Sequence, residues 1–383
     1  MSGQQTPLAS CTAPNLQALA QRGRCGCMVP IRPAEVPWRS EIELGWIVGG
    51  AASQAIQLYR GSLEALGIGL DPGDAAFIYR ANFVTMDGPM LVESRVDSLG
   101  WEETQTLTAA LQDRWGEPGL KIVATAPSQA VVILSDHTAD TAEPLPGIPP
   151  RLLEGASGDE LFPSGNVGRT LRGWFNQTRE ILELHEVNQV RVDLGENPAN
   201  GLCLSGGSAP VQPGAFKDPG KGRTAVLAHG AMGRGLARLA GSTEVKMRSP
   251  WTGSSEDSVL HGARIGEAIR NHDHILIVVE APHDLGGYGD LSKKTAALGR
   301  LDRVLLGPLQ QFLDSNRPWR GLFLADPEVR SPLDLEQPVS LPALLVGERI
   351  VPDSQDRWHE QACQNGGLDS IKPELLIEMF WED

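Results

Sequence analysis

The sequence lacks three features that would each point to a particular class of protein. No apolar run approaches the roughly 18 residues of a membrane span, and the first residues show no charged-then-apolar signal pattern. Basic residues are in deficit, with 33 Lys and Arg against 48 Asp and Glu and a formal net charge of −15. Nucleic acids and anionic membranes require a basic footprint, so we expect neither as a partner. The net charge does not exclude a small anionic ligand, which needs only a local basic pocket.

Cysteine is also scarce. The chain has 5 cysteines, an odd number for its 383 residues. They are scattered: Cys11, Cys25, Cys27, Cys203 and Cys363. This usage is typical of reduced thiols in the cytoplasm, where we expect the protein to be located. Cys25 and Cys27 are spaced like half a metal site, but no second Cys or His pair has zinc spacing, which favours two small buried side chains.

The segment 273–305 contains the strongest local pattern. Residues 275–279 are five branched apolar residues, which predict a strand buried on both faces. A turn rich in Pro and Gly follows and carries His283. The next segment has apolar residues at steps of three and four, which predict a helix that Pro308 kinks or ends. Ligands of open α/β sheets bind where such a strand ends.

Strand-like and helical segments also alternate elsewhere in the second half of the chain. The expected strands are 201–206, 224–230, 243–247, 320–327 and 343–350, and the expected helices are 232–241 and 258–270. Repeated βα units with short connections predict an α/β fold with a doubly wound, mostly parallel sheet.

Residues 56–190 differ from this pattern. Strands are predicted at 73–86 and at 121–134, the second being a hairpin that turns at 126–128. Helices are predicted at 101–115 and 169–185. This combination indicates an α+β module with its own small core, inserted into the sheet domain.

Ser40 follows a proline-rich loop and precedes a helical pattern, so it has two interpretations. It can cap the helix, with Glu43 three residues later as in a capping box. It can also be a nucleophile at a helix N-terminus, where the dipole favours an incoming phosphate. The pattern alone favours the cap, and both interpretations are kept.

The order of segments over nearly the whole chain resembles that of the archaeal-type cofactor-independent phosphoglycerate mutases, members of the alkaline phosphatase superfamily. The segments that carry the resemblance are TAPNLQALAQRG, YRGSLEALGIGLDPGDAAFIYRANFVTMDG, NPANGLCLSGG, AVLAHGAMGRGLARLAG, GDLSKKTAALGRLDR and GGLDSIKPELLIEMF. The resemblance implies an alkaline phosphatase-like core formed by 1–55 and 191–383, with an inserted α+β substrate domain at 56–190.

The resemblance also implies a chemistry, namely phosphoryl transfer between the 2- and 3-hydroxyls of glycerate through a phosphoserine. Two divalent ions, Mn²⁺ or Mg²⁺ in the family, activate the serine and hold the phosphoryl oxygens. Ser40 matches the nucleophile position, and Arg80 and Asn82 match the substrate-facing positions of the inserted domain. The alternative for Arg80 is a solvated strand residue.

The metal-ligand positions match poorly. Where the family has an Asp and then a His, this chain has His283 and Gly287, and where the family has Asp-His it has Asp326 followed by Pro327. The Asp that ends the family's first strand and a final His are expected to be missing as well. His283 and Asp326 are then the remnants of the metal site, too few to hold two hard cations.

We therefore expect a degenerate mutase-like protein without metal-dependent activity, which acts in binding or regulation and keeps a small-anion pocket. Its partners would be a small phosphorylated or carboxylate ligand and a protein partner or second copy. The alternative is an active phosphoglycerate mutase, or a related phosphotransferase, with an altered metal site. Fold alone does not distinguish them.

Overall fold

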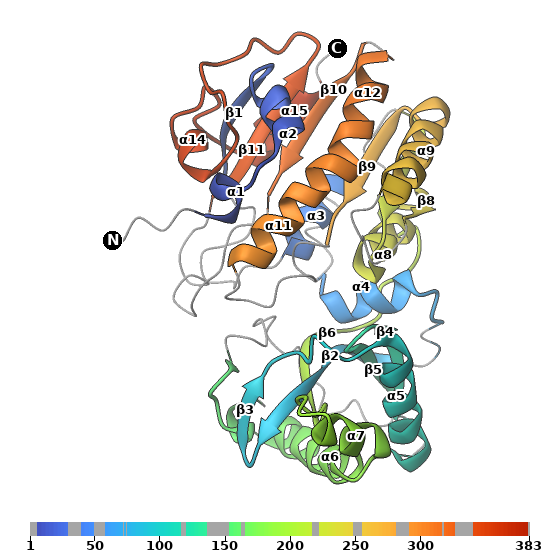
Figure 1. Ribbon diagram of the computed structural model, residues 1–383. Coiled ribbons are helices and arrows are strands. Elements are labelled where there is room, and N and C mark those ends of the chain that lie inside the picture. Colours follow the sequence, from blue (N-terminus) through green and yellow to red (C-terminus); the bar gives the residue numbers. More distant parts are fainter. Residues whose placement is uncertain are drawn as a thin grey trace. The chain divides into compact units, whose positions relative to one another are not determined.

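The computed structural model describes residues 6–29, 40–49, 58–71, 73, 75–115, 120–135, 153–161, 165–216, 222–247, 255–280, 291–315, 318–325 and 340–381. The chain forms two compact units (Figure 1). Unit 1 consists of Met1–Ile47, Pro219–His229 and Thr243–Asp383, and unit 2 of Val48–Asp218 and Gly230–Ser242. The assignment of 1–55 and 191–383 to a phosphatase-like core, and of 56–190 to a substrate domain, stays a prediction.

Unit 1 contains a parallel sheet of three strands. The central strand β7 (Thr224–Ala228) pairs with β8 (Thr243–Lys246) on one side and β9 (His274–Val278) on the other. Helix α9 (Ser255–Asn271) lies between β8 and β9 in the chain, as expected for repeated βα units.

A second sheet of unit 1 has the strand order β10-β11-β1-β12. Its strands are β10 (Arg320–Leu324), β11 (Leu341–Gly347), β1 (Gly23–Met28) and β12 (Ser370–Ile371). The β1–β11 and β10–β11 pairs are antiparallel and the β1–β12 pair is parallel. Three of the five pairings of the described strands in unit 1 are therefore parallel, and the predicted α/β class is confirmed.

The helices of unit 1 largely follow the sequence pattern. They include α1 (Pro7–Ser10), α2 (Pro14–Ala20), α3 (Ser40–Gly49), α14 (Glu360–Gln364) and α15 (Pro373–Trp381). Leu16, Leu19 and Ala20 are buried, as the spacing in α2 predicts. In β9, however, the prediction of burial on both faces was wrong, because residues 274–277 are half-buried. The reason is its position at the end of the described strand order β8-β7-β9.

Of the two outcomes predicted at Pro308, a kink or an end of the helix near Leu306, the end is excluded by the structure. Helix α11 (Leu291–Leu301) passes through a π-helical turn (Asp302–Leu306) into α12 (Gly307–Ser315), and both labels lie along one helical rod in Figure 1. Proline lacks an N–H and crowds the carbonyl four residues earlier, so a regular α-helix cannot accommodate it without strain. The wider π turn directly before it provides the local irregularity.

The π turn also completes a distant helix. Helix α2 begins after Ala13, whose side chain makes no capping hydrogen bond. The Asp302 carboxylate supplies the missing acceptors. It accepts hydrogen bonds from the Leu16 amide at 2.8 Å, the Asn15 amide at 3.2 Å and the Asn15 side-chain amide at 2.8 Å. Because a helix N-terminus has unpaired N–H groups and a positive dipole end, a buried carboxylate is well matched to it.

Unit 2 contains an antiparallel sheet of five strands. The order is β3-β2-β5-β4, and β6 pairs with β2 as well. The strands are β2 (Ala75–Asp87), β3 (Met90–Glu93), β4 (Leu120–Ala126), β5 (Gln129–Ser135) and β6 (Gly201–Ser208). The predicted hairpin is confirmed, with β4 and β5 joined at Pro127 and Ser128 and a positive φ of 61° at Ser128.

Both faces of this sheet are covered within unit 2. Tyr79, Ala81 and Phe83 join one core cluster with residues of the helices α5 (Trp101–Trp115) and α6 (Gly165–Glu183). The other face of β2 packs against α4 through Ile78. The remaining helical elements of unit 2 are α4 (Arg60–Gly67), α7 (Glu186–Asp193), α8 (Ala231–Ala240) and a 3₁₀ turn (Gly158–Leu161). The predicted α+β character is thus confirmed.

Helices α4 and α8 cross closely in unit 2. A Cβ added to Gly235 would lie 2.0 Å from the Leu63 carbonyl oxygen, so only glycine permits this approach. Gly241 ends α8 with a φ of 68°, a left-handed conformation that favours glycine. In the described part of the chain, no helix is long and apolar enough to cross a membrane.

Candidate functional site

Arg80 and Asn82 lie two residues apart on β2, and side chains at this spacing share one face of a strand. Arg80 is opposite Val131 of β5 and Ser205 of β6, and Asn82 is opposite Gln129 and Cys203. The two residues are only 6% and 5% exposed. The structure therefore brings the two predicted substrate residues together and excludes the alternative that Arg80 is a solvated strand residue.

A buried carboxylate joins Arg80 to a second arginine. The Glu64 Oε1 atom lies 2.8 Å from Arg60 Nε and 3.4 Å from Arg80 Nε, and the Glu64 side chain is 3% exposed. Arg60 is the first residue of α4 and Glu64 lies one turn later, so the helix geometry places both on one face. In the cluster Arg60–Glu64–Arg80, one buried carboxylate thus lies between two guanidinium groups.

Two acceptor atoms of this region have no hydrogen-bond partner among the residues that the structure describes. They are Oδ1 of Asn82 and Oε2 of Glu64, and both atoms are buried. The Asn82 side-chain amide donates a weak hydrogen bond to the Ser94 carbonyl at 3.4 Å. Because buried acceptors are normally paired, these atoms favour a molecule with hydroxyl donors beside the guanidinium groups.

Cys203 borders the same region. It is opposite Asn82 in the β2–β6 pairing, and its side chain is buried. Burial raises the pKa of the Cys203 thiol to about 12, against a smaller lowering by the charge of Arg80. The thiol is therefore protonated near neutral pH, and we assign it no nucleophilic role.

The structure describes the other predicted site residues only in part or not at all. Ser40 is the first residue of α3 in unit 1, and its side chain lies outside the described residues, as do His283 and Asp326 entirely. The nucleophile and metal-ligand roles of these three residues stay predictions. In the described part of the chain, no group of three or more His, Cys, Asp or Glu side chains is arranged to hold a metal ion.

Arg60 and Glu64 were missed by the sequence reasoning. Their i, i+4 spacing in the segment YRGSLE was the available signal, because an Arg–Glu pair at this spacing lies on one helical face. That spacing alone is common on solvated helices. Only the packing of α4 against β2 makes the pair a buried partner of Arg80.

Comparison with known proteins gives consistent results. Residues 20–188 match the sequence model of the family described as 2,3-bisphosphoglycerate-independent phosphoglycerate mutase. Proteins of that name from Methanothrix thermoacetophila and Thermococcus kodakarensis are each 26% identical to this chain. Each alignment covers 99% of this chain, with 94% and 92% of the respective relative. The structure of the PH0037 protein from Pyrococcus horikoshii superposes with a TM-score of 0.66 at 21% identity, covering 98% of this chain and 90% of that one.

These findings first define the class of protein. The chain is an α/β protein, and its fold is shared with the archaeal structure over nearly the full length. The sequence relatives that align over the same length of the chain are named as mutases. The chain is similar along nearly its whole length to the 2,3-bisphosphoglycerate-independent phosphoglycerate mutases, and residues 20–188 match the model of that family.

Proposed function

We propose that this mutase-like protein has lost metal-dependent mutase activity and binds a small phosphorylated or carboxylate compound. One observation carries the proposal. Gly287 and Pro327 occupy two positions at which the family resemblance implies histidine ligands. Neither residue has a side-chain donor atom, so neither can coordinate a metal ion through its side chain.

The donor set that is left does not fit two hard cations. Mn²⁺ and Mg²⁺ each prefer about six oxygen or nitrogen ligands. Of the metal positions named by the resemblance, His283 and Asp326 still carry donor side chains, and His283 replaces a carboxylate. The residues that remain are therefore too few to hold the pair of metal ions that phosphoryl transfer requires in the family.

The cluster in unit 2 supports the binding part of the proposal. Its two guanidinium groups are shielded from water, because the Arg60, Glu64 and Arg80 side chains are 12%, 3% and 8% exposed. An anion in such a place interacts more strongly than at the surface. The unpaired acceptor of Asn82 suits a hydroxyl of the same ligand, so a phosphorylated or carboxylated hydroxy compound fits both features.

We place this role in the cytoplasm, where reduced thiols persist, and extend it to regulation through a protein partner or a second copy of the chain. The acidic composition supports neither nucleic acid nor membrane as a partner. The alternative function is active mutase chemistry, interconverting 2- and 3-phosphoglycerate, which the names of the relatives favour.

The decisive experiment measures turnover and metal content together. Purified protein is incubated with 3-phosphoglycerate and excess Mn²⁺ or Mg²⁺, and the formation of 2-phosphoglycerate is followed beside a matched Ser40→Ala variant. We expect no turnover above the variant and less than one bound metal per chain by elemental analysis. Turnover that disappears in Ser40→Ala would refute the loss of activity and establish the alternative.

Binding is tested separately by calorimetry with 3-phosphoglycerate. We expect Asn82→Asp, which places a negative charge beside the cluster, to weaken binding, and Arg80→Gln to do the same. Arg179→Gln is the matched control, because Arg179 pairs with Glu183 on the surface of α6. Equal affinity in all four proteins would remove the cluster as the binding site.

A further inference from the structure

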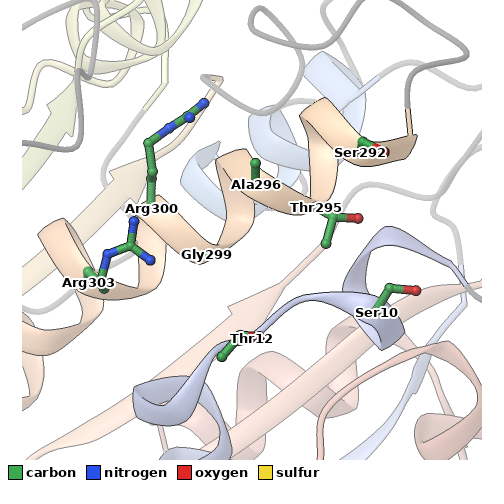
Figure 2. A pocket seen from close by; sticks show the side chains of 8 residues that line it. All are labelled: Ser10, Thr12, Ser292, Thr295, Ala296, Gly299, Arg300 and Arg303. Atoms are coloured by element: carbon green, nitrogen blue, oxygen red, sulfur yellow. The ribbon is translucent and has the colours of Figure 1, made fainter.

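Unit 1 contains an open surface cavity of about 640 Å³ between the chain around Ser10–Thr12 and α11, and most of its lining residues are exposed. This volume is typical of sites for small molecules, which span roughly 300–1,000 Å³. The lining residues are Ser10, Thr12, Ser292, Thr295, Ala296, Gly299, Arg300 and Arg303 (Figure 2). Four of them carry hydroxyl groups, two are arginines and none is acidic.

Within the described part of the chain, no acidic side chain neutralises the two arginines. Among the described residues, neither the Arg300 nor the Arg303 guanidinium forms an ion pair or a hydrogen bond. The adjacent Asp302 does not compensate them, because its carboxylate accepts hydrogen bonds from Asn15 and Leu16 at the start of α2. In a chain with a net charge of −15, this cavity is a local positive site.

The cavity has free space beside these groups because Gly299 has no side chain. A Cβ added to Gly299 would lie 3.3 Å from the Thr12 carbonyl oxygen and 3.8 Å from Arg303 Nη1, so any larger residue would fill the space between Thr12 and Arg303. In Figure 2 the Thr295 side chain points toward the segment that carries Ser10 and Thr12, and Arg303 lies beside Gly299. Arg300 extends away from Arg303, toward the other side of α11.

We propose that this cavity binds a small phosphate monoester, with Arg303 as the ligand of the phosphate and Arg300 adding positive charge from its more distant position. A guanidinium presents paired N–H donors that match two phosphate oxygens, and hydroxyls can donate to the remaining oxygen and accept from the organic part. The absence of a carboxylate from the lining makes a dianion more favourable here than a neutral or cationic molecule. This site lies in unit 1 and is independent of the cluster around Arg80 in unit 2.

The test uses titration calorimetry of the full chain with inorganic phosphate, 3-phosphoglycerate and glycerate. We expect the two phosphates to bind and glycerate not to bind at this site. Arg303→Gln should weaken phosphate binding at least about tenfold, the loss that follows from removing a charge-assisted hydrogen bond. Thr295→Val, which removes a hydroxyl at nearly constant volume, should weaken it less, and Arg300→Gln combined with Arg303→Gln should abolish it.

Arg114→Gln is the matched control, because it removes one positive charge from an exposed position on α5 in the other unit. Unchanged phosphate affinity in Arg303→Gln, an equal loss in Arg114→Gln, or no phosphate binding at all would each overturn the proposal. Phosphate binding that survives in Arg80→Gln but is lost in Arg303→Gln supports this site even if the proposed function fails. The converse result assigns binding to the cluster around Arg80 and refutes this site.

Discussion

Asp302, in the π turn after α11, caps α2 through hydrogen bonds to residues such as Asn15, which is 287 positions away in the chain. We expect Asp302→Ala to destabilise the N-terminus of α2 by about 2–4 kcal/mol. The estimate follows from the structure, because the substitution removes the acceptor of the Asn15 and Leu16 backbone amides and leaves the Asn15 side chain only its 3.2 Å hydrogen bond to the backbone carbonyl of residue 302. Asp302 itself is only 1% exposed, so water replaces these acceptors poorly.

The variant Asp302→Asn tests the contribution of the negative charge, because asparagine has nearly the same shape as aspartate. The amide keeps one oxygen that can accept a hydrogen bond but loses the negative charge that complements the helix dipole, so we expect a smaller loss of about 1–2 kcal/mol. Asp314→Asn is the control, because Asp314 pairs with Arg22 on the surface and its side chain is 41% exposed. An exposed pair contributes less than about 1 kcal/mol.

The assay is native-state hydrogen exchange read by mass spectrometry on peptides that contain α2. Exchange by local opening accelerates in proportion to the lost free energy, and 2 kcal/mol corresponds to about a 30-fold increase. We expect this increase in Asp302→Ala, a smaller one in Asp302→Asn and none in Asp314→Asn. An unchanged rate in Asp302→Ala, or an equal change in the control, would refute the assignment of Asp302 as the cap of α2.

Two further predictions concern buried charge and pH. Glu64→Ala should lower the free energy of unfolding by about 3–5 kcal/mol in urea denaturation, since it removes the carboxylate between Arg60 and Arg80. The equally spaced but exposed pair gives the control, as Glu183→Ala should cost less than about 1 kcal/mol, and equal losses would contradict the burial argument. His359 accepts a hydrogen bond from the Ala362 amide as the N-cap of α14, and burial, with the charge of Arg357, lowers its pKa. Because the unfolded chain then binds the proton more readily, this contribution to stability is present above the ordinary histidine pKa and is lost as the pH falls below it. His359→Asn keeps a capping acceptor without titration, so thermal melts should show a flatter pH dependence below pH 6.5 than in the parent protein, and identical profiles would exclude this role.

Local patterns predicted much of the secondary structure. The helix expected at 101–115 is α5 (Trp101–Trp115), and the hairpin expected to turn at 126–128 is β4–β5. Both succeed because amphipathic period and turn chemistry are properties of a short stretch of chain. At Pro308 the sequence left a kink and a helix end open, since it shows the proline but not the π turn that accommodates it.

The sequence by itself determined the resemblance to the family, the alternation of strands and helices, and the pairing of Arg80 with Asn82 on one strand face. The tertiary structure decided which charges meet. Glu64 reaches Arg80 because α4 packs on β2, Asp302 completes α2 from the far end of the chain, and Arg303 lies beside Gly299 in the cavity of unit 1. Periodicity reports which face of an element is apolar, whereas contacts between distant elements depend on how the chain packs, and these contacts set the burial and the charge balance of each proposed site.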